Sequence, residues 1–268
     1  SGRNNTACSY YSTVGGGSNN TAFNSYSTVG GGQSNKACGL YSTVGGGFSN
    51  IACGNYSFVG GGRNVRVLSA FGTAGGGCNN QVEGEKSTIG GGVANQVKGI
   101  ATTIAGGYQN AALGSTGAIA GGLANKIYAA ATGCGDSFIG GGASNKVCPG
   151  TFNVIGGGNL NKIVGRAGIC GGETFANTIG GGKFNAAYGA CITIGGGKYN
   201  FPEGRGSTIA GGYLNSTSIN ALEGVVAGGS TNKVCRTKGA IGGGMCNTLS
   251  GNYGFIGAIQ FAVLAQVY

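Results

Sequence analysis

The sequence predicts an all-β protein, a single-chain parallel β-solenoid with about 15 residues and two short strands in each coil, and about 17 coils. Three observations predict it. A glycine triplet returns at a nearly fixed interval, an apolar residue precedes almost every triplet, and an asparagine follows almost every one. Because a single small coil cannot bury its apolar face alone, a repeat of this kind folds only by stacking on its neighbours.

The glycine triplets set the period and divide the chain. The interval between successive triplets is constant from Gly15 to Ala120, becomes longer from Ala120 to Gly140 and becomes shorter from Cys170 to Gly180. We therefore expect one continuous solenoid over residues 1–268, with a loop insertion near 126–137, a shortened coil near 170–180 and a terminal apolar strand over 255–268. The triplets begin at Gly15, Gly30, Gly45, Gly60, Gly75, Gly90, Ala105, Ala120, Gly140, Gly156, Cys170, Gly180, Gly195, Ala210, Ala227 and Gly242.

Two columns of small apolar residues predict a narrow core. The residue before each triplet is Val, Ile or Ala, as at Val14, Val29 and Ile89, and a Ser often lies two positions earlier. Two positions after the repeat Asn lies a second apolar residue, such as Ala22 or Val82. Because side chains along a strand alternate between faces, both columns are expected to point inward.

The turns are assigned to glycine, and the coil contacts to asparagine. We expect the triplet to form one turn and a second glycine, such as Gly39, Gly54 or Gly84, to form the other, since tight turns need positive φ. The asparagines at Asn20, Asn35, Asn50 and their equivalents repeat with the same period. Stacked asparagine side chains are expected to hydrogen-bond from coil to coil, as in ladders of parallel strands.

The outward side chains form two columns that we take as the candidate interface. One is aromatic and one is threonine, and a contiguous exposed aromatic stripe is typical of an interface. Simple stacking between neighbouring coils is the alternative explanation, and a threonine array could also bind ice. The candidate interface residues are Tyr11, Tyr26, Tyr41, Tyr56, Phe71, Thr13, Thr28 and Thr43.

Five of the ten cysteines lie in one column, three positions after the repeat Asn. Cys38 and Cys53 lie on adjacent coils, and the ~4.8 Å coil spacing suits the Cα separation of a disulfide. Disulfides and free thiols that act as small hydrophobes are both open at this point. The candidate disulfide or thiol column is Cys8, Cys38, Cys53, Cys148 and Cys235.

Composition argues against an enzyme, and we expect no catalytic residue, cofactor or metal. The chain has 64 Gly, no His and 6 acidic residues, so a Ser-His or Cys-His pair is impossible. Zinc is not favoured without His or a Cys-x-x-Cys motif. Glu83 and Glu85 share a strand face and are interpreted as a solvated edge rather than an acid pair. No apolar run reaches the length of a membrane-spanning helix.

The basic charge is spread thinly. The net charge is +10, but the lysines are far apart along the chain and form no dense run. This favours a role in solubility over nucleic acid, which we do not expect as a partner.

The repeat resembles the head repeats of trimeric autotransporter adhesins and related Gly-rich repeats of phage and viral fibres. The similarity lies in the Ser-Thr-Val-Gly stretch at residues 12–15, 27–30 and 42–45, and in the Ala-x-Gly stretch at 37–39 and 52–54. It implies a left-handed β-roll and a homotrimer in which three chains pack side by side.

From the repeat and the resemblance together we expect a structural or adhesive β-solenoid of a surface fibre or appendage, extracellular or at a cell or virion surface. Its partner would be itself, with a cell-surface receptor or glycan as ligand. A self-assembling filament that stacks end to end is the alternative, and an ice-binding solenoid is the third hypothesis.

Overall fold

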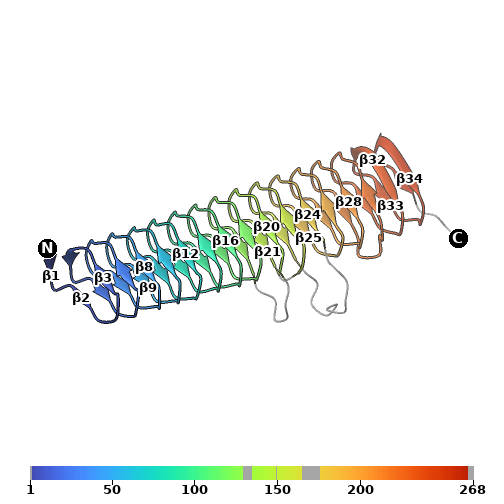
Figure 1. The fold of residues 1–268 in the computed structure, drawn as a ribbon. Coiled ribbons are helices and arrows are strands. Elements are labelled where there is room, and N and C mark those ends of the chain that lie inside the picture. The colour runs from blue at the N-terminus through green and yellow to red at the C-terminus, as the bar shows by residue number, and fades with distance from the viewer. Residues whose placement is uncertain (1, 129–134, 149, 165–175, 265–268) are drawn as a thin grey trace. The chain divides into compact units, whose positions relative to one another are not determined.

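The computed structural model describes residues 2–128, 135–148, 150–164 and 176–264. Within them every regular element is a β-strand, and about 16 turns of roughly 15 residues form a parallel β-solenoid, which confirms the predicted fold class. The chain divides into two compact units, Ser1–Ala129 and Ala130–Tyr268. In each unit the turns stack one on the next (Figure 1). In the described residues no helix has the length and apolar character needed to cross a membrane.

Unit 1 contains two parallel sheets, and each turn contributes one two-residue strand to each of them. Each strand residue pairs with the equivalent residue one turn later, as Thr28 does with Thr43 and Ala37 with Ala52. The first sheet contains β3 (Thr13–Val14), β6 (Thr28–Val29), β8 (Thr43–Val44), β10 (Phe58–Val59), β12 (Thr73–Ala74), β14 (Thr88–Ile89), β16 (Thr103–Ile104) and β18 (Ala118–Ile119). The second contains β2 (Thr6–Ala7), β5 (Thr21–Ala22), β7 (Lys36–Ala37), β9 (Ile51–Ala52), β11 (Arg66–Val67), β13 (Gln81–Val82), β15 (Gln96–Val97), β17 (Ala111–Ala112) and β19 (Lys126–Ile127). A third, two-stranded parallel sheet pairs β1 (Gly2–Arg3) with β4 (Gly17–Ser18).

Unit 2 repeats this arrangement. One sheet contains β20 (Phe138–Ile139), β22 (Val154–Ile155), β24 (Thr178–Ile179), β26 (Thr193–Ile194), β28 (Thr208–Ile209), β30 (Val225–Val226), β32 (Ala240–Met245) and β34 (Phe255–Gln260). The facing strands are β21 (Lys146–Val147), β23 (Lys162–Ile163), β25 (Ala186–Ala187), β27 (Phe201–Pro202), β29 (Ser216–Thr217), β31 (Lys233–Val234), β33 (Thr248–Leu249) and β35 (Val263–Leu264). Where one terminal apolar strand is expected over 255–268, the structure has two strands in different sheets, β34 and β35, and residues 265–268 lie outside the described residues.

The strand register in unit 2 corrects one expectation about the coils. Ile155 pairs directly with Ile179, and Ile163 with Ala187, so successive turns here are further apart in sequence than those of unit 1. The triplet at Cys170 predicts a shortened coil near 170–180 and about 17 coils, whereas the pairing of Ile155 with Ile179 leaves no separate coil between them and the solenoid has about 16 turns. Residues 165–175, which include this triplet, lie outside the described residues. The expected insertion near 126–137 falls mainly on residues 129–134, which are likewise not described.

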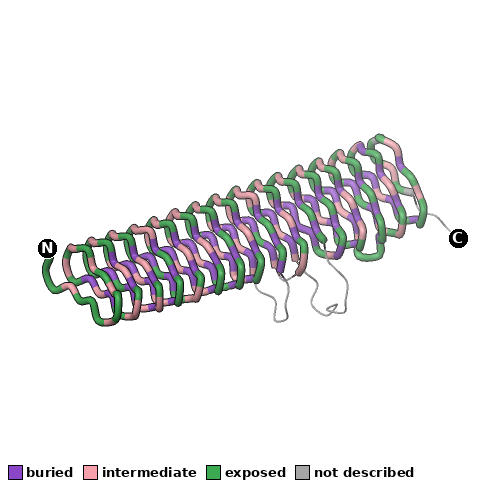
Figure 2. The backbone as a smooth tube through the Cα atoms, in the orientation of Figure 1, coloured by how far each residue is buried: buried purple, intermediate pink, exposed green. Residues whose placement is uncertain are grey.

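The core is a thin layer between the two sheets, as the apolar columns predicted. Val29, Val44 and Ile89 on one sheet and Ala22 and Val82 on the other are fully buried. Figure 2 shows the buried backbone running along the strands of each unit, with exposed segments at the turns. Burial of each Val or Ile contributes roughly 1.5–3 kcal/mol, and the Ala positions let the sheets approach closely.

The glycines serve two different purposes, and only one was predicted. The third glycine of the triplet has the expected positive φ, +87° at Gly32 and +93° at Gly47. The second-turn glycines such as Gly39 do not; a Cβ there would lie 2.1 Å from the carbonyl oxygen of Gly54 on the next coil. That turn obtains its positive φ from Tyr41, at +57°. Gly39 is therefore required for close approach of two coils, not for turn geometry.

A buried asparagine ladder connects the coils. The side-chain Oδ1 of Asn20 accepts the backbone N–H of Asn35 at 2.9 Å, and Asn35 accepts that of Asn50 at 2.9 Å. The Nδ2 of Asn35 donates to Gly31 O in its own coil and to Gly47 O in the next. The predicted ladder is thus present, but it runs mainly from side chain to backbone. In unit 2 the same bonds join Asn145, Asn161, Asn185, Asn200, Asn215, Asn232 and Asn247.

Candidate functional site

The five predicted aromatic residues form one stacked column on the surface of unit 1, named here the aromatic column: Tyr11, Tyr26, Tyr41, Tyr56 and Phe71. Neighbouring ring centroids are 4.6–5.2 Å apart and the ring planes lie within 14° of parallel. The spacing follows the ~4.8 Å strand separation. The predicted stacking between coils is therefore present. The side chains nevertheless remain 44–76% exposed, so each ring contacts its neighbours through its faces and solvent through its edge.

Backbone geometry holds these rings in line. Each residue of the aromatic column has a φ between +55° and +58°, a left-handed conformation that costs a non-glycine residue roughly 1–2 kcal/mol. Hydrogen bonds between coils support it, as from the N–H of Tyr56 to Leu40 O at 2.8 Å. Ring stacking offsets part of the cost, at about 0.5–1.5 kcal/mol per pair.

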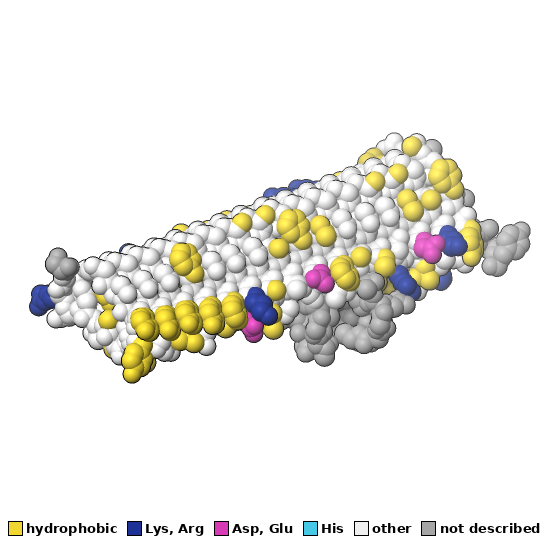
Figure 3. All heavy atoms as spheres, in the orientation of Figure 1, with side chains coloured by type: hydrophobic (Ala, Val, Ile, Leu, Met, Phe, Trp, Pro, Cys, Tyr) yellow, Lys and Arg dark blue, Asp and Glu magenta, His cyan; other side chains and the backbone are white. Residues whose placement is uncertain are grey.

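The aromatic column ends at an ion pair. Lys86 occupies the next equivalent position with the same left-handed φ, and its Nζ lies 3.4 Å from the carboxylate of Glu85. Figure 3 shows a row of hydrophobic side chains that stops at adjoining basic and acidic side chains. The backbone at this position therefore accepts a lysine.

The predicted threonine column lies on the strands of the first sheet of unit 1, where each threonine precedes a core residue. Thr13, Thr28 and Thr43 are register partners, and Thr13 is exposed while the other two are half-buried. Phe58 then interrupts the column, and Ala118 ends it in unit 1. A flat, uninterrupted array of hydroxyls, which ice binding would need, does not form among the described residues.

One disulfide forms in the cysteine column, between Cys38 and Cys53, whose Cα atoms are 4.5 Å apart. Cys8, Cys148 and Cys235 of the same column are free thiols. The physical reason is register: the equivalent position on the coil after Cys8 is Phe23, and Ser218 precedes Cys235. A cysteine two coils away is out of reach, so only adjacent coils can be joined.

The two glutamates singled out by sequence do not form an acid pair. Glu83 lies 3.4 Å from the Nζ of Lys98 and also contacts Gln81, whereas Glu85 pairs with Lys86. Both carboxylates are thus neutralised by separate partners at the surface. This fits the interpretation as a solvated edge.

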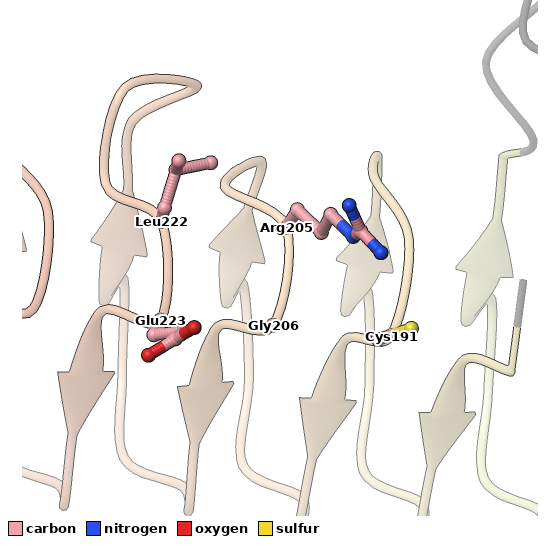
Figure 4. Close-up of a pocket in the computed structure, with 5 residues that line it drawn as sticks. All are labelled: Cys191, Arg205, Gly206, Leu222 and Glu223. Atoms are coloured by element: carbon pink, nitrogen blue, oxygen red, sulfur yellow. The ribbon is translucent and has the colours of Figure 1, made fainter.

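A shallow pocket in unit 2 arises where the left-handed column lacks a side chain. Gly206 lies between Cys191 and Glu223, and the space of about 300 Å³ is lined also by Arg205 and Leu222 (Figure 4). Arg205 and Glu223 are exposed at the rim of this pocket. Among the described residues no group of three or more His, Cys, Asp or Glu side chains gathers that could hold a metal ion.

A group of basic and aromatic side chains in unit 2 was missed by the sequence analysis. Lys183 and Lys198 are register partners, and their Nζ atoms lie 5.4 and 4.9 Å from the ring centroids of Phe184 and Tyr199. The two rings stack at 5.0 Å. The signal was present as Gly-Gly-Gly-Lys followed by an aromatic residue and Asn, at 180–185 and again at 195–200. The lysines look distant in sequence, but stacking brings them to adjacent coils.

Comparison with known proteins adds no family assignment. No family model matches this chain, and no match was found among curated proteins.

Proposed function

We propose that this chain is a structural and adhesive β-solenoid of a surface fibre or appendage, extracellular or on a cell or virion, and that it assembles with copies of itself through the aromatic column. The observation that carries the proposal is the exposed stack from Tyr11 to Phe71. An apolar stripe of this kind on a rigid frame is typical of an interaction surface.

A second copy of the chain is the partner that suits this surface best. The aromatic column carries no charge over five successive coils, so two or three such columns meet without repulsion. Identical columns also share one axial repeat, because each ring is set by the same strand spacing. Aromatic residues with few rotatable bonds lose little entropy when they become buried. Packing of three chains side by side is what the adhesin-like repeat implied.

The test is the mass of the chain in solution, measured by light scattering. We expect a discrete trimer for the wild type, and dissociation to monomers for the triple variant Tyr26→Lys, Tyr41→Lys and Tyr56→Lys, with affinity reduced by more than about a hundredfold. Lys86 shows that lysine fits this backbone. Reductant is expected to leave the mass unchanged, because the disulfide joins two coils of one chain.

Tyr108→Lys is the matched control. Tyr108 is 47% exposed in unit 1 but lies in another surface column, where Arg63 occurs naturally. The Tyr108→Lys variant is expected to stay trimeric. A monomeric wild type would contradict self-assembly, and long polydisperse polymers would favour the end-to-end filament instead.

A further inference from the structure

Four lysines occupy four successive coils of unit 2, and we name them the lysine strip: Lys146, Lys162, Lys183 and Lys198. Lys146 and Lys162 are register partners, as are Lys183 and Lys198. The pairing of Lys162 with Ala186 places the four coils in sequence. Lys146 and Lys162 come directly after the ladder asparagine, and Lys183 and Lys198 lie two positions before it, so the strip consists of two pairs in two columns, one on each side of the asparagine ladder.

The charge of the lysine strip is not neutralised within the described part of the chain. The ion pairs there involve Lys86, Lys98 and Lys238. Like charges placed opposite each other on parallel strands are destabilising. The aromatic rings beside Lys183 and Lys198 give partial compensation, since an ammonium over a ring gains about 0.5–1 kcal/mol at an exposed site. A repeated arrangement that costs stability points to an anionic ligand.

We propose that the lysine strip binds an acidic polysaccharide, one that carries sulfate or uronate groups at regular intervals. Each ammonium group is a compact donor for a sulfate or carboxylate oxygen. Within each pair the two lysines lie on coils ~4.8 Å apart, so a linear polyanion laid along the stack meets two successive cations in each column. The exposed Tyr213, the register partner of Lys198 on the next coil, supplies apolar surface against which the C–H face of a sugar ring packs.

Nucleic acid suits the lysine strip less well. Single strands bind by stacking bases on open aromatic faces. Here the faces of Phe184 and Tyr199 cover each other at 5.0 Å, with interplanar angle 9°, and the ammonium groups of Lys183 and Lys198 lie over the same rings.

This inference rests on the adhesive role proposed above and specifies its ligand, but the lysine strip lies in unit 2 and the aromatic column in unit 1. Self-assembly through the aromatic column and polysaccharide binding by the lysine strip can therefore be disproved separately. Mass by light scattering reports the column, and polysaccharide binding reports the strip, on the same protein samples.

The experiment measures binding of the full chain to dextran sulfate, a polyuronate, neutral dextran and oligo-dT of equal charge, at about 0.15 M salt. We expect binding to one or both acidic polysaccharides, none to dextran, and weaker binding as salt rises. Lys183→Gln with Lys198→Gln, and Lys146→Gln with Lys162→Gln, are each expected to weaken binding about 25-fold, or about fivefold per lysine.

Two further variants separate charge from structure. Lys86→Gln with Lys98→Gln removes the same charge from ion-paired sites in unit 1 and is expected to change affinity less than about twofold. Lys183→Arg with Lys198→Arg keeps the charge and is expected to retain binding. Equal affinity of the wild type and both lysine-strip doubles, tighter binding to oligo-dT, or no binding even at low salt would overturn the proposal.

Discussion

Replacement of Asn35 by alanine is expected to destabilise unit 1 by about 3–5 kcal/mol, the sum of the hydrogen bonds lost and the buried groups left without a partner. The Asn35 side chain is 1% exposed and makes three hydrogen bonds of 2.8–2.9 Å, to Gly31 O, Gly47 O and the N–H of Asn50. Its removal takes away the hydrogen-bond partner of the Asn50 N–H and of Gly31 O inside the stack, while Gly47 O keeps the bond from the N–H of Gln33 at 2.9 Å. Urea unfolding followed by circular dichroism measures the loss.

Asn55→Ala is the matched control for this substitution. Asn55 is exposed and its side chain accepts one bond, from the N–H of Leu40 at 3.0 Å. Water can replace that bond, so the expected cost is below about 1 kcal/mol. Equal costs for Asn35→Ala and Asn55→Ala would show that the ladder does not hold the coils together.

Gly47→Ala is expected to cost more than about 3 kcal/mol, whereas Gly46→Ala changes stability by no more than about 0.5 kcal/mol. Gly47 has φ +93°, and a Cβ there would lie 2.2 Å from the carbonyl oxygen of Gly62. At Gly46 the nearest such atom is Gly31 O at 3.9 Å, an ordinary contact. Thermal and urea unfolding of the two single variants give the comparison.

Comparison of Gly46→Ala with Gly47→Ala tests which glycine of the triplet the structure requires. Both residues stand next to each other in the same turn, so side-chain volume and helix or strand propensity are matched. If Gly46→Ala proved as damaging as Gly47→Ala, the assignment of positive φ and close approach to the third glycine would be wrong.

The fold was predictable because its cause is local and repeated. A constant period with Val or Ile before the triplet and Asn after it specifies which side chains point inward, and Val29, Asn35 and Ala37 are all buried as expected. The position of the aromatic column followed from the same period. Because each coil pairs in register with the one before it, equivalent residues of successive coils lie next to each other.

The departures arose where sequence spacing does not determine register. The triplet at Cys170 looked like a turn, yet Ile155 pairs with Ile179, and only the hydrogen-bonded partners reveal this. The left-handed conformation of Tyr41 was missed because positive φ was assigned to glycine alone. The lysine strip was missed because lysines were judged by distance along the chain, whereas stacking places Lys183 beside Lys198.

The central claim is that stacked coils are joined by buried asparagines, and native-state hydrogen exchange followed by NMR tests it most directly. The backbone N–H of Asn35 and Asn50, each bonded to the side chain of the previous ladder asparagine, is predicted to exchange only through unfolding of the stack. The exposed side-chain amide of Asn55 is predicted to exchange rapidly. Ladder amides that exchange at the rate of an unstructured peptide would contradict the account.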